Sequence, residues 1–154
     1  MHNIDISDID KIVLFNLDDI KYAFQLSAVE RVVSSVEITP LPKAPDIVLG
    51  IVNYQGLIIP VIDIRKRFRL PTKELSLEAQ FVIAKTSKRL IVIVVDSVSG
   101  VYELGKSQIV DSAEAFPYTV YLSGISKIDS NIVLITDLEK FLTNEEEKIL
   151  GEIV

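Results

Sequence analysis

The stretch that most constrains the fold of this chain is residues 46–68, which predicts a β-hairpin. Two apolar arms, residues 48–52 and 57–64, flank a polar turn at residues 53–56 that reads Asn-Tyr-Gln-Gly. Apolar runs separated by such a turn are typical of antiparallel strands, and Gly56 accepts the positive φ that a tight turn requires. We expect a rigid hairpin that holds out a turn, and nothing in it indicates reaction chemistry.

Length, charge and cysteine content narrow the class of protein. A chain of 154 residues suits one domain, residues 1–154, and is long enough to fold without disulfides or metals. The net charge of −6 disfavours nucleic acid and anionic membrane surfaces as partners. The absence of cysteine excludes thiolate catalysis and cysteine zinc sites.

The apolar runs of the chain are short. The longest, residues 90–95, is far below the ~20 residues of a membrane-spanning helix. Residues 1–5 lack the basic and apolar regions of a secretion signal. We therefore expect a cytoplasmic protein that does not insert into membranes.

Alternation and turn signals predict the other elements. Residues 20–26 alternate as a half-buried strand, and two more hairpins are expected over 80–96 and 121–136. Residues 90–95 are apolar throughout, which is typical of a strand buried between two layers. Ser27 and Glu30 have the spacing of a capping box and predict a short helical turn. Residues 105–119 are interpreted as a long connection, and Asp137 is expected to cap a C-terminal helix, 137–150.

The first hairpin has an echo later in the chain. Gly50 and Asp63 recur as Gly124 and Asp137, in both cases 74 residues later. Any two strand-turn-strand units share this pattern, so the echo alone leaves two interpretations open. Under the other interpretation, one domain holds two similar subdomains, built from strands of 12–68 and of 79–136.

The charged residues after the hairpin do not indicate catalysis. Asp63 is interpreted as a cap for the following turn rather than as an acid or base. Arg65, Lys66, Arg67 and Arg69 form a basic cluster, but no glycine-rich phosphate loop accompanies them. We interpret this cluster as a solvated basic face or as a contact for an acidic protein.

Other candidate sites are equally weak. His2 is the only histidine and has no partners at metal-ligand spacing, and the aspartates within residues 5–10 lack the glycine and glutamate of a calcium loop. Ser126 and Lys127 are neighbours in a predicted strand, so their side chains point to opposite faces and cannot cooperate. We expect no catalytic residue, metal or cofactor.

A surface for protein binding is the remaining interpretation. Residues 29–33, the proline-rich loop 40–45 and the turn 53–56 are close in sequence and are expected to crowd one edge. Exposed β-branched residues there would form a protein-binding groove. The alternative, which the sequence leaves open, is that Val29 and Val32 fill the core under the short helical turn.

These features together resemble the CheW-like chemotaxis adaptor family over nearly the whole chain. Residues 50–65 carry the most specific match, Gly-Ile-Val-Asn-Tyr-Gln-Gly-Leu-Ile-Ile-Pro-Val-Ile-Asp-Ile-Arg. Weaker matches occur in the expected order at Val29 with Val32, at Pro45, and at residues 22–24, 38–42, 93–101, 121–124 and 132–142.

The resemblance implies a mostly β fold of two small five-stranded barrels packed on a shared core, with a short N-terminal helical turn and a C-terminal helix. It also implies a non-catalytic adaptor that links the cytoplasmic tips of chemoreceptors to the regulatory domain of a histidine kinase, CheA. One subdomain would contact the kinase, and a groove between the subdomains would hold the receptor. The partner-binding positions we expect are Val29, Arg31, Val33, Gly50, Asn53, Gln55, Gly56 and Phe81.

Two positions depart from the family pattern. The turn usually reads Asn-x-Arg-Gly, and this chain has Gln55; the helical turn usually reads Val-x-Glu-Ile, and Arg31 replaces the glutamate. Such changes alter which partner charges are tolerated. A second hypothesis is therefore a divergent module that competes for or scaffolds the same partners in a non-chemotaxis pathway. An enzyme or small-ligand domain is the third, and it requires an enclosed pocket with perturbed titratable groups.

Overall fold

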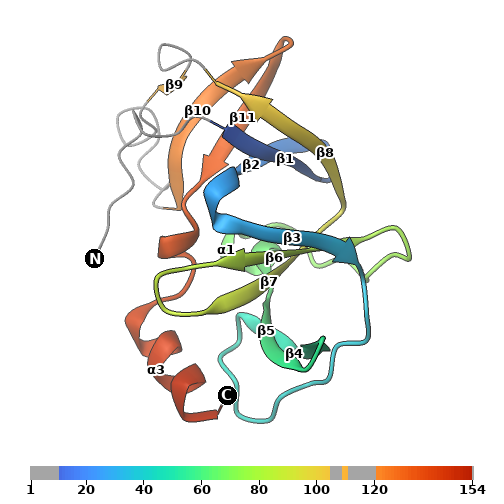
Figure 1. Ribbon diagram of the computed structural model, residues 1–154, viewed down its shortest axis with the longest axis vertical. Coiled ribbons are helices and arrows are strands. Elements are labelled where there is room, and N and C mark those ends of the chain that lie inside the picture. The colour runs from blue at the N-terminus through green and yellow to red at the C-terminus, as the bar shows by residue number, and fades with distance from the viewer. Residues whose placement is uncertain (1–10, 105–108, 111–120, 154) are drawn as a thin grey trace.

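The protein is mostly β-structure, arranged as two sheets that lie one above the other in Figure 1. The computed structural model describes residues 11–104, 109–110 and 121–153. The first sheet has six strands, in the order β8 (Ser97–Glu103), β1 (Lys11–Leu17), β2 (Ile20–Gln25), β11 (Asn131–Thr136), β10 (Leu122–Ile128) and β9 (Ile109–Val110). The second has five, in the order β3 (Val29–Ser34), β6 (Gln80–Lys85), β7 (Leu90–Val95), β5 (Leu57–Ile62) and β4 (Val48–Tyr54).

The two halves of the chain exchange strands. The first half places β1 and β2 in the first sheet and β3, β4 and β5 in the second. The second half does the reverse, with β6 and β7 in the second sheet and the later strands in the first. Each sheet therefore mixes strands of 12–68 with strands of 79–136, so the expected subdomain contents do not describe the sheets.

The echo seen in the sequence is a structural repeat. In the β4–β5 hairpin the register shifts between Val48 and Gly50, and in the β10–β11 hairpin it shifts between Leu122 and Gly124. The backbone N–H groups of Asp63 and Asp137 donate 2.8 Å bonds to the carbonyls of residues 47 and 121, again 74 residues apart. This match favours the interpretation that the domain holds two similar subdomains over the interpretation that any two hairpins would look alike.

The repeat extends to the edge strands at a second spacing. In the second sheet Ala84 of β6 pairs with Val29 of β3, and in the first sheet Phe15 of β1 pairs with Val98 of β8. Both edge strands carry a bulge at the next residue, Glu30 or Ser99, which lie 69 positions apart. Position by position, β3 in one sheet therefore corresponds to β8 in the other.

The predicted hairpins are confirmed, and the first has a two-residue turn. Gln55 and Gly56 have φ values of 51° and 86°. Positive φ at both central residues is the geometry of a type I′ turn, whose twist matches that of the flanking strands. The equivalent turn at Asp129 and Ser130 has φ values of 48° and 70°, without a glycine.

Three apolar clusters fill the fold. One lies between the sheets and includes Ile91 and Ile93 of β7, while Val92 of the same strand belongs to a cluster formed by the second sheet alone. The third belongs to the first sheet and includes Ile12 and Leu14. Strand β7 is apolar on both faces because a cluster lies on each side of it, as its sequence predicts.

The helical segments correct two expectations. Ser27 lies inside a 3-10 helix, Leu26–Ala28, and Glu30 already belongs to β3, so the predicted capping box is wrong. Asp137 caps only a 3-10 helix, Leu138–Lys140. The C-terminal helix, α3, begins later, at Asn144–Ile153. The Thr143 hydroxyl accepts from Glu146 N at 3.1 Å and starts a new cap, which leaves Phe141 free to enter the core.

Several expectations fall outside the described residues. They concern His2, the aspartates of residues 5–10 and most of the connection 105–119, of which the structure describes the short strand β9. Within the described ranges, no cluster of three or more metal-ligating side chains occurs. The described residues also include no helix of the length and apolarity that crossing a bilayer requires.

Candidate partner-binding surface

The predicted binding positions separate into buried and exposed groups. Gly50 and Phe81 are buried, Val29 and Val33 are half-buried, and the other four are exposed: Arg31, Asn53, Gln55 and Gly56. The buried members support the scaffold, and the exposed members lie on two strands of the second sheet and on the turn of its hairpin.

Gly50 is required by a close backbone approach. Its φ is 154°, and a Cβ there would overlap the carbonyl oxygen of Thr39 and lie 2.8 Å from the Ile38 side chain. Thr39 and Ile51 exchange two backbone hydrogen bonds of 2.9 Å. The proline-rich loop is thereby held against the outer edge of β4, and Gly50 itself has no side chain to offer a partner.

Phe81 and the three valines pack inward. The side chain of Phe81 is 1% exposed within the apolar cluster of the second sheet, and Val33, its partner across the strands, packs on the same cluster. Phe81 therefore has no surface to offer a binding partner, contrary to expectation. Val29 and Val32 pack against the core between the sheets, as the alternative interpretation predicts.

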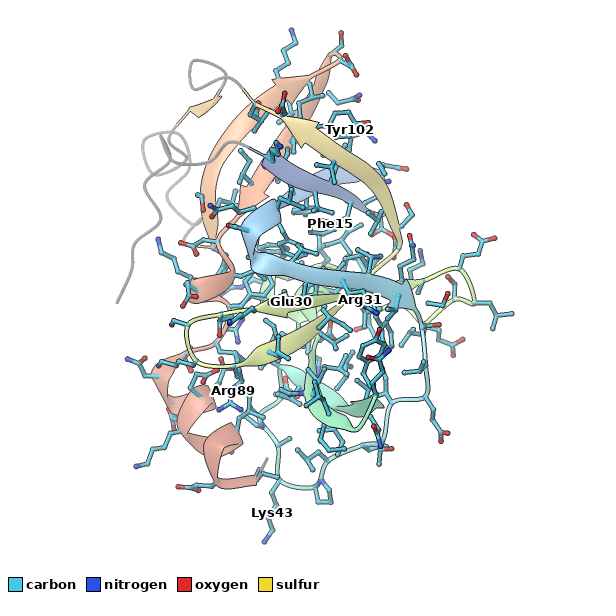
Figure 2. All side chains as sticks on the ribbon, in the orientation of Figure 1. Phe15, Glu30, Arg31, Lys43, Arg89 and Tyr102 are labelled. Atoms are coloured by element: carbon cyan, nitrogen blue, oxygen red, sulfur yellow. The ribbon has the colours of Figure 1, made fainter. Side chains whose placement is uncertain are left out.

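The exposed members meet around the hairpin turn. Arg31 Nη1 donates to the Tyr54 hydroxyl at 3.0 Å, although β3 and β4 are opposite edges of the second sheet. The bond shows that the sheet curls until its edges approach. The Asn53 side-chain oxygen accepts from Gly56 N at 3.0 Å and stiffens the turn, with Gln55 at its tip. Figure 2 shows Arg31 on β3, above this hairpin.

Sequence reasoning missed three contributors to this surface. Tyr54 anchors Arg31, and Leu57 and Ile58 are 53% and 49% exposed on opposite faces of the start of β5. The sequence did carry a signal for Leu57 and Ile58, because they follow the turn directly, and the rest of their strand is buried. We call these residues the turn surface: Arg31, Asn53, Tyr54, Gln55, Gly56, Leu57 and Ile58.

The basic cluster after β5 is a solvated basic face only at Lys66 and Arg69, which are exposed, and the interpretation is wrong for Arg65 and Arg67. Arg65, in the short helix α1 (Ile64–Arg67), bonds Asp18 at 2.8 Å and Asp96 at 2.8 Å, and its side chain is 11% exposed. Arg67 bonds Glu146 of α3 at 2.6 Å. These arginines join distant parts of the fold, so they are not available to a phosphate or to an acidic partner.

The ion pairs of Arg65 explain the perturbed titration of its partners. The hydrogen bond from Arg65 holds the pKa of Asp18 below its ordinary value, although burial opposes this. Burial alone would raise the pKa of Asp96, but hydrogen bonds from Asp18 N, Arg65 and Lys73 outweigh it and lower that pKa. Both shifts follow from structural ion pairing and do not indicate catalysis.

Two other candidates behave as structural residues. Asp63 accepts from Lys66 N at 3.2 Å and caps α1, as predicted. Ser126 is 3% exposed while Lys127 is exposed, so the two point to opposite faces of β10, as predicted. Neither arrangement supplies a nucleophile with a base.

Comparison with known proteins agrees with this geometry. A family model described as CheW-like domain matches residues 11–146. The chain belongs to the CheW-like domain family. Among curated CheW-like relatives, the chemotaxis protein CheW of Klebsiella aerogenes is 27% identical, covering 92% of this chain and 86% of its own. The chemotaxis protein CheW of Thermotoga maritima is 26% identical, covering 86% of this chain and 87% of its own.

The CheW-like fold is also found in a solved structure. The crystal structure of the scaffolding protein TtCheW from Thermoanaerobacter tengcongensis matches with a TM-score of 0.80 and 30% identity. The match covers 89% of this chain and 94% of that one. The CheW-like resemblance implies two five-stranded barrels; the described residues form one sheet of six strands and one of five, and in neither are the first and last strands paired with each other.

Proposed function

We propose that this CheW-like chain is a non-catalytic cytoplasmic adaptor that couples the tips of chemoreceptors to the regulatory domain of a CheA-type histidine kinase. The observation that carries the proposal is the turn surface, a stiff type I′ turn with one exposed aliphatic side chain on each face of the strand that follows it. Rigid, partly apolar surfaces of this kind favour protein binding because little conformational entropy is lost on association.

The kinase and the receptor would use different parts of the fold. The family resemblance implies that a single subdomain contacts the kinase. Because the turn surface lies wholly within the second sheet, we assign it to the kinase regulatory domain. The equivalent edge strands β3 and β8 come from different sheets, and Val101 of β8 is 56% exposed where its counterpart Val32 is half-buried. We assign to the receptor the face of these two strands that carries Val32 and Val101, because Arg31 lies on the other face of β3. In Figure 1, β3 crosses the middle of the molecule and β8 runs upward from it.

Direct binding tests the adaptor role. The full chain is mixed with the purified regulatory domain of the cognate kinase and, separately, with the cognate receptor tip. We expect binding to both by isothermal titration calorimetry and recovery of a ternary complex on a sizing column. Failure to bind either protein at tens of micromolar would contradict the proposal.

A second candidate function is a module that competes for the same partners without activating the kinase. It is favoured by Arg31 and Gln55, the two positions that depart from the family pattern on this surface. Kinase activity in reconstituted receptor arrays separates the two functions. An adaptor raises the receptor-controlled activity, whereas a competitor lowers it when added to arrays that already contain a functional adaptor.

A further inference from the structure

The guanidinium of Arg31 differs from those of Arg65, Arg67 and Arg89. Arg65, Arg67 and Arg89 are largely buried, and each is bonded to a carboxylate. Arg31 is exposed, and within the described part of the chain its bonded partner is the neutral hydroxyl of Tyr54. A guanidinium carries five N–H donors in a planar fork that matches a carboxylate. Most of that fork remains free at Arg31.

The free fork is held in a fixed place. Tyr54 packs partly on the apolar cluster of the second sheet, so its ring is anchored while its hydroxyl orients Arg31. Across the hairpin Tyr54 pairs with Leu57, which is 53% exposed. A cation and an exposed aliphatic side chain therefore flank the same tyrosine.

The fold itself does not require this arrangement, as the repeat demonstrates. The positions equivalent to Arg31, Tyr54 and Leu57 in the first sheet are Gly100, Ile128 and Asn131. That hairpin forms the same strand pairing with neither a cation nor an exposed leucine at these positions. The cation, the tyrosine and the exposed leucine are thus additions to the scaffold, and binding is what they can serve, whereas the exposed Ile58 has an exposed counterpart in Ile132.

We propose that the turn surface binds a segment of the kinase regulatory domain that carries a carboxylate beside an aliphatic side chain. The inference rests on the adaptor function and names the contact that the kinase makes. The partner carboxylate forms a two-pronged ion pair with the free edge of Arg31, and the aliphatic group covers Leu57. The chain has a net charge of −6 and would repel an acidic segment elsewhere, so the positive charge of Arg31 is what makes binding of that segment favourable here.

Titration of the cognate kinase regulatory domain with variants of the full chain tests the contact. We expect Arg31→Ala to weaken the dissociation constant about tenfold and Arg31→Glu more, because a like charge then faces the partner. Arg31→Lys keeps the charge without the fork and should fall between Arg31→Ala and the wild type. The matched control is Lys127→Glu, an exposed cation on the hairpin of the first sheet, which should stay within about twofold.

Two further readouts separate a lost contact from a damaged fold. Thermal unfolding of Arg31→Glu should match the wild type, because Arg31 is exposed and its bond to Tyr54 is at the surface. An acidic residue of the kinase domain replaced by lysine should restore binding to Arg31→Glu. Raising the salt concentration should weaken the wild-type complex more than the Arg31→Ala complex.

The outcomes distinguish this inference from the adaptor function. Kinase binding that is unchanged in Arg31→Glu overturns the acidic contact and leaves the adaptor role standing. Loss of receptor binding alone in that variant also overturns it, because the occupant of the turn surface is then the receptor. A wild-type chain that binds neither partner removes the adaptor function, and the acidic contact falls with it.

Discussion

Two clamps hold the sheets together at equivalent places, and they use different chemistry. In one, Arg65 after β5 bonds Asp18 in the β1–β2 turn at 2.8 Å. In the other, Glu139 after β11 accepts bonds of 2.6 and 2.8 Å from the backbone N–H and hydroxyl of Ser87 in the β6–β7 turn. Glu139 follows Arg65 by 74 positions and Ser87 follows Asp18 by 69, the two spacings of the repeat.

The two clamps also differ in their surroundings. Arg65 reaches a second carboxylate, Asp96, and the Arg65 side chain is 11% exposed, so one buried cation serves two anions. The bonds to Glu139 are at the surface. Both repeats place a hydrogen-bonded polar contact at these positions, but the charges of the residues that form it differ. The burial of each contact then decides how much it stabilises the fold.

A substitution at Gly50, in the bulge that precedes the Arg65 clamp, should have the largest effect on stability. Gly50→Ala adds a Cβ against the backbone of Thr39 at an unfavourable φ, so we expect the free energy of unfolding to fall by about 3–5 kcal/mol in urea titrations. The matched control is Gly151→Ala in α3, where a Cβ has only Arg89 at 3.9 Å and helix propensity improves. Equal stability of the two variants would refute the close approach.

Arg65→Ala should weaken the charged clamp substantially. We expect a loss of about 2–3 kcal/mol in the free energy of unfolding, because two carboxylates lose their shared cation. The loss stays below that of a fully buried pair because the Asp18 side chain is 46% exposed. Chemical denaturation at neutral pH measures it, and a free energy of unfolding equal to that of the wild type would show that the clamp is not structural.

The same clamp predicts a pH dependence. Asp18 and Asp96 both have pKa values held below the ordinary 3.8, so their stabilising charge is complete above that pH. It is lost as the pH falls through the lower pKa values of the folded state. Between pH 5 and strongly acidic solution, the wild type should therefore lose more stability than Arg65→Ala does, and parallel curves would contradict this.

Gly56→Val tests the turn that presents the binding surface. Gly56 has a φ of 86° with open space around it, so the cost is conformational, about 1–3 kcal/mol, and binding should weaken with it. Gly56→Asn is the matched control, because asparagine tolerates positive φ and the equivalent Ser130 already has φ of 70°. Wild-type stability and binding in Gly56→Val would show that the turn differs from this description.

The clamp between Glu139 and Ser87 should show the smallest effect. Glu139→Gln keeps one oxygen acceptor for Ser87 and loses the charge and the second acceptor oxygen, and because both bonds are at the surface we expect a fall of about 1 kcal/mol or less in the free energy of unfolding. Circular dichroism melts of this variant and of Arg65→Ala compare the clamps directly. An effect as large as that of Arg65→Ala would remove the distinction between the two bridges.

The local features of this fold are readable from the sequence. Alternation, turn residues and the glycine of the type I′ turn are encoded within a few positions, so the hairpins and the cap at Asp63 are predictable. The family resemblance added the overall architecture. Four members of the turn surface, Arg31, Asn53, Gln55 and Gly56, were predicted because they lie in segments matched to the family, whereas the exposed Leu57 and Ile58 were missed.

Long-range features escape such reasoning. The partners of Arg65 are 47 and 31 positions away, so its burial could not be inferred from a basic run. Phe81 lies in a strand that is buried on both faces, and only the pairing of β3 with β6 reveals which cluster it enters. The exchange of strands between halves is likewise a property of pairing across the chain, which no local pattern records.

The exchange of strands also governs how the molecule can be made and divided. During synthesis β1 and β2 leave the ribosome early, yet β11, the parallel neighbour of β2, is the last strand to emerge. The first sheet therefore remains incomplete until residue 136 has been translated. A cut in the exposed loop between α1 and β6 would yield two fragments, each holding parts of both sheets, and neither would fold until it met the other.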